Sequence, residues 1–181
     1  MVIEFRKPTK TEAEIIRDSL QYWVDKEKLQ LITEKYHFVV GDGNWKEVFI
    51  TNRITSTFVT KKKRISPYSI GLGIGEIKNN ELLLTLSGGY FISPHTDMRA
   101  IINLEAEQLF LYKRDLYCKS IISIKEGLSK GDKVLVANTS NDYLGLGKIL
   151  LPISDFGDPK KEDEVAIKNI IDLGWYLRKG K

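Results

Sequence analysis

The chain has 181 residues, 42% hydrophobic and 29% charged, a composition typical of a folded protein rather than a disordered one. Its 28 Lys and Arg residues outnumber 24 Asp and Glu residues, so the net charge of +4 favours polyanionic partners only mildly. The single cysteine, Cys118, excludes an internal disulfide and a multi-cysteine zinc site. Because no apolar run approaches the roughly 20 residues of a membrane span, we expect a cytoplasmic protein.

The first half of the chain predicts one helix and two antiparallel hairpins. Apolar residues recur at helical spacing within residues 11–23. Residues 36–50 contain two β-like runs around a turn rich in Gly, Asp and Asn, and residues 68–86 contain two more around an Asn-Asn pair. Glycine and proline turn signals follow, and they place a domain boundary near residue 97.

The second half predicts a small β-rich domain with a single helical segment. Residues 106–112 form the helical segment, and β-like runs are found at 100–103, 133–137, 143–150 and 166–171. Turn residues precede the second and third of these runs, which favours a meander within a small barrel.

Three separated motifs in this half resemble a PUA domain, an RNA-binding module. They are the sequence Ala-Glu-Gln-Leu-Phe-Leu-Tyr at 106–112, the strand entry at 130–134 and the glycine-spaced strand at 144–147. The whole chain is similar to the archaeal branch of the Nip-seven ribosome-biogenesis family, in which an Ala-Glu-Gln and Phe-Leu-Tyr signature is characteristic. The similarity continues into the Gly-Trp-Tyr-Leu-Arg ending at 174–178, whereas residues 24–66 match loosely.

This resemblance implies an α+β protein, with an N-terminal antiparallel-sheet α/β domain at 1–97 and a C-terminal PUA-type β pseudobarrel at 98–181. It implies that the PUA domain binds U- or AU-rich single-stranded RNA. It further implies a non-catalytic role in pre-rRNA processing and large ribosomal subunit assembly. The first domain is expected to recruit ribosome-assembly or RNA-processing proteins.

RNA binding requires cations that neutralise phosphate and planar side chains on which unpaired bases stack. The predicted RNA-binding residues are Lys113, Arg114, Lys119, Arg178, Lys179 and Lys181. We expect them to meet in one groove beside Tyr112, Trp175 and Tyr176. The alternative is that the cations only solvate the surface and that the rings belong to the core, in which case a final strand lets only one of Trp175 and Tyr176 face inward.

A second cationic run, Lys61, Lys62, Lys63 and Arg64, is either a secondary RNA contact or a solvated loop. If about five cations neutralise phosphate, the logarithm of the affinity should fall against the logarithm of salt concentration with a slope near −3.5.

Other chemistry has weaker support. Gly71, Gly73 and Gly75 suggest a nucleotide loop, but the residues that follow are strand-like rather than helical. His37 and His95 have no metal-binding spacing, so we predict neither a metal nor a cofactor.

The competing function is an RNA-modifying enzyme, or its RNA-targeting subunit, of the pseudouridine synthase or transglycosylase type. Pseudouridine synthesis uses an aspartate as nucleophile, and the candidates for that role are Asp42, Asp97, Asp115 and Asp132. None has a recognisable catalytic surround, and the last two are better explained as turn or cap residues, so we predict no catalytic residue. A third possibility is an interaction protein whose basic residues never contact RNA.

Overall fold

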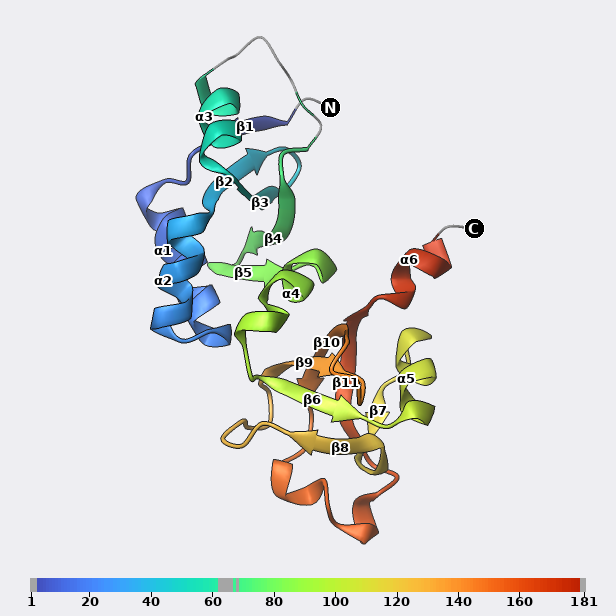
Figure 1. Ribbon diagram of the computed structural model, residues 1–181. Helices are drawn as coiled ribbons and strands as arrows, with labels where there is room; N and C mark the ends of the chain where they lie inside the picture. Colours follow the sequence, from blue (N-terminus) through green and yellow to red (C-terminus); the bar gives the residue numbers. More distant parts are fainter. Residues whose placement is uncertain (1–2, 62–66, 68, 180–181) are drawn as a thin grey trace. The chain divides into compact units, whose positions relative to one another are not determined.

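The computed structural model describes residues 3–61, 67 and 69–179, and the chain divides into two compact units, residues 1–95 and 96–181 (Figure 1). Each unit contains its own β-sheet. Both sheets are mainly antiparallel and carry helices, which confirms the predicted α+β class. No helix in the described part of the chain is long and apolar enough to cross a bilayer.

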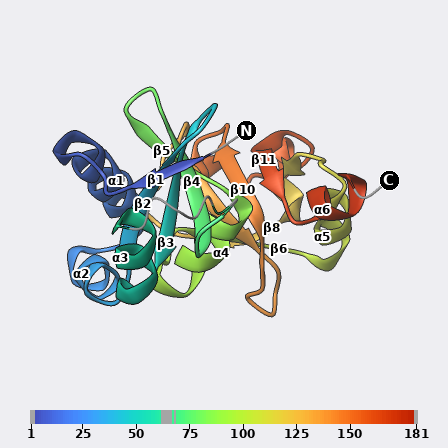
Figure 2. The same ribbon diagram turned by 90° about the horizontal axis from the view of Figure 1, so that it is seen from above.

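The first unit is a five-stranded antiparallel sheet whose strands follow chain order. The strands are β1 (Glu4–Arg6), β2 (His37–Asp42), β3 (Lys46–Thr51), β4 (Leu72–Lys78) and β5 (Glu81–Leu84). The helices are α1 (Lys10–Trp23), α2 (Lys26–Lys35), α3 (Arg53–Lys61), α4 (Leu86–Ile92) and the 3-10 turn η1 (Ser93–His95). Helices α1 and α2 lie on one side of the sheet and α4 lies on the other (Figures 1 and 2).

Both predicted hairpins are confirmed: β2 pairs with β3, and β4 pairs with β5. Asn79 and Asn80 form the second turn with φ of 51° and 59°, a left-handed conformation that asparagine tolerates well. At the edge of the sheet, the backbone N–H of Leu82 in β5 donates to Ser19 Oγ of α1 at 2.9 Å. Helix α1 therefore holds the outer side of the last strand.

The glycine turn signal expected before the domain boundary is the pair Gly88 and Gly89, and its interpretation as a turn was wrong, because both residues lie inside α4. Thr85 caps this helix by accepting a hydrogen bond from the N–H of Gly88 at 3.0 Å. A Cβ atom at Gly88 would collide with the carbonyl of Ile74. Glycine is needed there for close packing of the helix on β4 rather than for a turn.

Helix α1 begins with a capping box that is joined to an ion-pair network. Thr9 Oγ1 accepts from the N–H of Glu12 at 3.2 Å, and the carboxylate of Glu12 accepts from the N–H of Thr9 at 2.9 Å. Arg6 donates to both oxygens of Glu12 at 2.7 and 2.8 Å, and Lys46 Nζ donates at 3.1 Å. The hydrogen bonds from Arg6 hold the pKa of Glu12 well below its usual range.

Replacing Glu12 with glutamine is expected to lower the free energy of unfolding by about 2 kcal/mol at neutral pH. A lowered pKa in the folded state means that the stabilisation is complete above the unfolded-state pKa of about 4.3 and is lost as pH falls below it. Urea unfolding of both proteins at a series of pH values measures this difference. A difference that stays constant down to pH 2 would contradict the assignment.

The second unit is a six-stranded sheet in the order β7-β11-β10-β9-β6-β8, and only the β6–β9 pair is parallel. The strands are β6 (Arg99–Ile102), β7 (Leu116–Tyr117), β8 (Ile121–Ile124), β9 (Lys133–Ala137), β10 (Tyr143–Ile149) and β11 (Val165–Asp172). The helices are α5 (Leu104–Leu111) and α6 (Gly174–Lys179), with 3-10 turns η2 (Cys118–Ser120), η3 (Ile153–Asp155) and η4 (Pro159–Lys161). The sheet curls around a core that includes Phe110, Val134 and Ile167, which confirms the predicted pseudobarrel.

Candidate nucleic-acid interface

Helix α5 ends in a turn that places two cations outside the helix. The N–H of Lys113 donates to the carbonyl of Phe110 at 2.9 Å, and the N–H of Arg114 donates to the carbonyl of Leu109 at 3.0 Å. This is the pattern of a Schellman motif, whose left-handed position is usually glycine. Lys113 occupies it with φ of 64°, at a cost of about 1 kcal/mol. Lys113 is exposed, so this strained position places a positive charge on the surface at the end of α5.

Helix α6 begins directly after β11 and lies against the end of α5. A Cβ atom at Gly174 would collide with the carbonyl of Leu111, so only glycine allows this approach. Arg178 donates to the same Leu111 carbonyl and forms two further hydrogen bonds to Asp172, at 2.9 and 3.0 Å. The side chain of Asp172 is 1% exposed. Arg178 therefore joins β11, α5 and α6.

Asn169 of β11 ties the turn after α5 to the sheet. Its side-chain amide donates to the carbonyl of Phe110 at 2.8 Å and to Asp172 Oδ2 at 3.2 Å. Its backbone N–H donates to Asp115 Oδ1 at 2.8 Å. The segment that carries Lys113 and Arg114 is thus fixed to the same strand that leads into α6.

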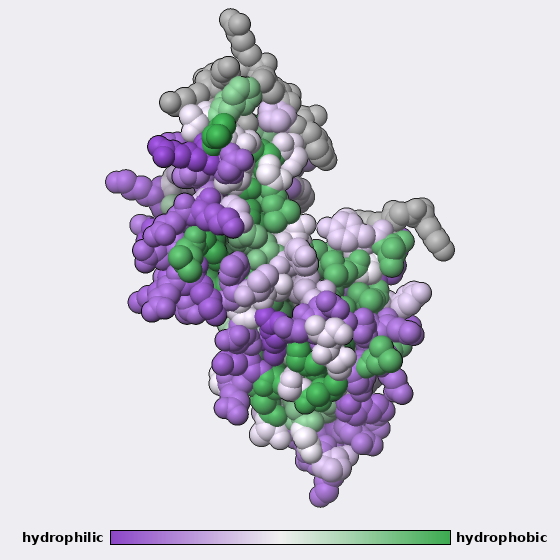
Figure 3. Space-filling view, in the orientation of Figure 1, coloured by the Kyte–Doolittle hydropathy of each residue, from purple (hydrophilic) through white to green (hydrophobic). Residues whose placement is uncertain are grey.

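The aromatic residues near these cations are on the surface. Tyr112 is 73% exposed, Trp175 38% and Tyr176 54%, and the last two rings meet edge to face at 5.2 Å between centroids. The interpretation of these rings as core residues was wrong, because α6 is a helix on the surface rather than a final strand of the sheet. Figure 3 shows hydrophobic residues gathered over α5 and α6; the exposed apolar residues of these helices are Leu104, Leu109 and Leu177.

Of the predicted cations, Lys113, Arg114 and Arg178 lie close together, since Arg178 bonds to Leu111 and the turn follows it directly. Lys179 is the last residue of α6, and Lys181 lies outside the described residues. We call the surface formed by residues 109–114 and by α6 the α5–α6 surface.

Lys119 is not part of the α5–α6 surface, contrary to the predicted groove. Its Nζ forms an ion pair with Asp163 Oδ1 at 2.5 Å, and that contact raises the pKa of Lys119. Lys119 follows β7, which pairs with β11 at Val165, whereas α6 follows the other end of β11. Seven residues of a strand span about 23 Å, so the length of β11 separates Lys119 from Arg178 in α6.

Two family models match the chain: the one described as the UPF0113 PUA domain covers residues 99–181, and the one described as the NIP7/UPF0113 pre-PUA domain covers residues 5–86. The chain belongs to the UPF0113 family. A UPF0113 protein of Archaeoglobus fulgidus is 28% identical over 177 residues, which cover 98% of this chain and 96% of that protein. PUA-domain and NIP7-like membership implies RNA binding and a role in ribosome biogenesis.

Solved structures resemble this UPF0113 protein over nearly its whole length. A hypothetical protein of Pyrococcus horikoshii has a TM-score of 0.66 at 16% identity and covers 93% of each chain. A conserved PUA domain protein of Thermoplasma acidophilum has a TM-score of 0.64 at 14% identity, covering 97% of this chain and 98% of that one. At these identities the similarity concerns the fold.

The other candidate sites of this UPF0113 protein lie outside the α5–α6 surface. Lys61 is the last residue of α3, and Lys62, Lys63 and Arg64 lie outside the described residues. The glycine run that suggested a nucleotide loop enters β4, where a Cβ atom at Gly75 would collide with the carbonyl of Leu83. Within the described residues no group of three His, Cys, Asp or Glu side chains could hold a metal ion. Burial raises the pKa of the Cys118 thiol, as expected of a structural cysteine.

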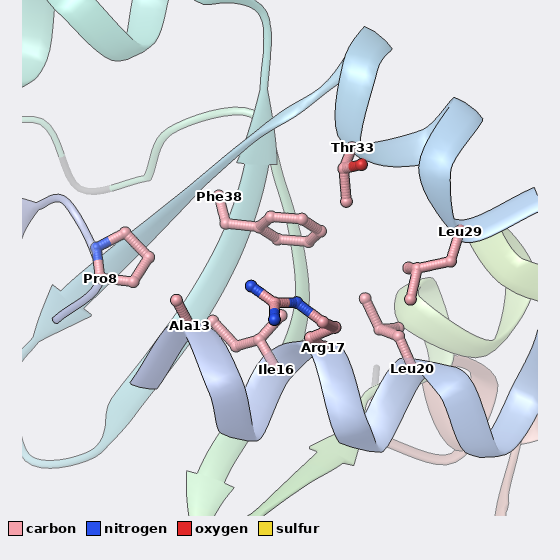
Figure 4. A pocket seen from close by; sticks show the side chains of 8 residues that line it. All are labelled: Pro8, Ala13, Ile16, Arg17, Leu20, Leu29, Thr33 and Phe38. Carbon is pink, nitrogen blue, oxygen red and sulfur yellow. The ribbon is translucent and has the colours of Figure 1, made fainter. Parts of the chain in front are cut away.

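The first unit of this UPF0113 protein contains a small apolar cavity of about 130 Å³ between α1, α2 and β2 (Figure 4). Phe38 and Leu29 contribute to its walls, and among the described residues that line it Arg17 alone carries a charge. The cavity brings together no acid, base or nucleophile that would point to catalysis.

Proposed function

We propose that this protein is a non-catalytic RNA-binding factor of ribosome assembly that acts in the cytoplasm. The α5–α6 surface of the PUA domain binds single-stranded U- or AU-rich pre-rRNA during processing and large-subunit assembly. The first domain recruits ribosome-assembly or RNA-processing proteins.

The observation that carries the proposal is the juxtaposition of exposed rings with cations on a rigid support. Tyr112 and Tyr176 offer planar faces for base stacking, while Lys113 and Arg114 supply charge for phosphate. The hydrogen bonds of Arg178 fix the two helices relative to each other, so RNA meets a preformed surface rather than one that must be ordered.

The double substitution Lys113→Gly and Arg114→Gln tests the proposal without weakening the fold. Glycine relieves the left-handed strain at position 113, so stability should be kept or raised by up to about 1 kcal/mol. Affinity for fluorescent oligo(U) RNA should fall about 10-fold, and the salt slope should become shallower by about 1.4 through the loss of two phosphate contacts. Fluorescence anisotropy over a series of KCl concentrations measures both quantities.

The matched control is Lys125→Gln with Lys160→Gln, which removes two exposed positive charges from the same unit. It should leave affinity and salt slope close to those of the wild type. If both double variants weaken binding equally, the attraction is a property of net charge and the α5–α6 surface has no special role.

A further inference from the structure

Three lysines lie side by side on neighbouring strands of the second unit. Lys148 of β10 pairs directly with Lys133 of β9 on one side and with Lys168 of β11 on the other. Residues that are directly opposite in a sheet project from the same face. We call Lys133, Lys148 and Lys168 the lysine row.

The lysine row projects away from the barrel core. Val134, Ile149 and Ile167, the sequence neighbours of the three lysines, are completely buried in that core. Since side chains alternate between faces along a strand, the lysines point outward. Lys148 and Lys168 are exposed, and Lys133 is half-buried.

Placing like charges directly opposite one another is unfavourable for a sheet, and here it occurs twice in succession. Two other lysines of this unit have carboxylate partners: Lys119 pairs with Asp163, and Lys161 pairs with Asp155 at 2.6 Å. Neither Lys148 nor Lys168 forms an ion pair within residues 3–61, 67 and 69–179. Among the described residues, no carboxylate therefore compensates the charges of Lys148 and Lys168, which lie directly opposite each other.

We propose that the lysine row is a second RNA-binding site, which holds the sugar–phosphate backbone without reading the bases. Neighbouring strands lie about 4.8 Å apart, so the row is about 10 Å long and can face about three phosphates of a stacked strand. The proposal rests on the proposed function, because it assigns the row to the same RNA that stacks on the α5–α6 surface.

Strand β11 connects the two sites. Lys168 lies four residues before Asp172, which holds α6 through Arg178, and this separation is about 13 Å along a strand. Ile170, which lies between Lys168 and Asp172, is 44% exposed and so places an apolar side chain on the surface between the two sites. An RNA strand that leaves the α5–α6 surface along β11 therefore reaches the row after a few nucleotides.

The test compares wild type with the double substitution Lys148→Gln and Lys168→Gln, using oligo(U) of about 20 and about 6 nucleotides. With the long RNA, the variant should bind about 10-fold more weakly at about 100 mM KCl, and its salt slope should be shallower by about 1.4. With the short RNA, which the α5–α6 surface alone can hold, the two proteins should bind equally. Lys125→Gln with Lys160→Gln again serves as the matched control.

The possible outcomes separate this proposal from the proposed function. Unchanged long-RNA affinity in the row variant, with binding still lost in the Lys113→Gly and Arg114→Gln variant, would overturn the lysine row alone. If wild type binds neither RNA, both proposals fail. If polyglutamate displaces the long RNA as effectively as unlabelled oligo(U) does, and only when the row is intact, the row serves an acidic protein surface and the RNA assignment is wrong.

Discussion

Replacing Arg178 with alanine is expected to lower the free energy of unfolding of the second unit by about 3 kcal/mol. The loss is large because Asp172 is buried and, among the described residues, its carboxylate would keep only the hydrogen bond from Asn169. The carbonyl of Leu111 would also lose its side-chain donor. Urea unfolding followed by circular dichroism measures the difference.

A double-mutant cycle with Asp172→Asn provides the control. In the Asp172→Asn background the residue at position 172 is neutral, so removing Arg178 leaves no unpaired buried charge. Arg178→Ala should then lower the free energy of unfolding by less than about 1 kcal/mol. An equal cost in both backgrounds would mean that the ion pair does not account for the stability. Arg178→Ala is for this reason a poor test of RNA binding by itself, since it removes a proposed phosphate ligand and a structural support together.

Removing the exposed rings should weaken RNA binding while leaving the fold intact. Tyr112→Ala and Tyr176→Ala are each expected to reduce affinity for oligo(U) by about 10-fold, since one base stacked on an aromatic ring contributes about 1–3 kcal/mol. The salt slope should not change, because no phosphate contact is lost. Fluorescence anisotropy at several KCl concentrations distinguishes this effect from that of the cation variants.

Tyr90 offers a matched control for the ring variants, because it is a tyrosine of the first unit with 66% exposure. Tyr90→Ala should bind RNA as tightly as the wild type. Unaltered affinity in the Tyr112→Ala and Tyr176→Ala double variant would remove base stacking from the proposal and leave only an electrostatic attraction.

Local sequence signals were sufficient for both hairpins and for β6, β9, β10 and β11 of the barrel, but they did not predict the short strands β7 and β8. The Asn79-Asn80 turn could be predicted because its conformation depends on those two residues themselves. The sequence could not predict that α6 is a helix, because the three apolar residues after Gly174 fit a strand as well as a helix. What decides between them is the packing of Gly174 on Leu111, a contact between segments more than 60 residues apart.

Only part of the candidate site could be predicted, because the rest of it also depends on contacts between distant segments. Lys113 and Arg114 stand out as a cationic pair after a recognisable helix, whereas Asn169 and Asp172 sit in an apolar strand with nothing local to mark them. The pairing of Lys119 with Asp163 depends on how the loop before β11 folds back, which no spacing rule reveals. Likewise, the lysine row exists only through strand register.

The contact between Ser19 and Leu82 limits how the first unit can associate with other proteins. An edge strand with free backbone amides invites another chain to extend the sheet, a common route to aggregation. In β5 the amide of Leu82 is already bonded to the helix beside it. A partner that contacts the sheet at the β5 edge must therefore recognise side chains, because it cannot extend the sheet through the amide of Leu82.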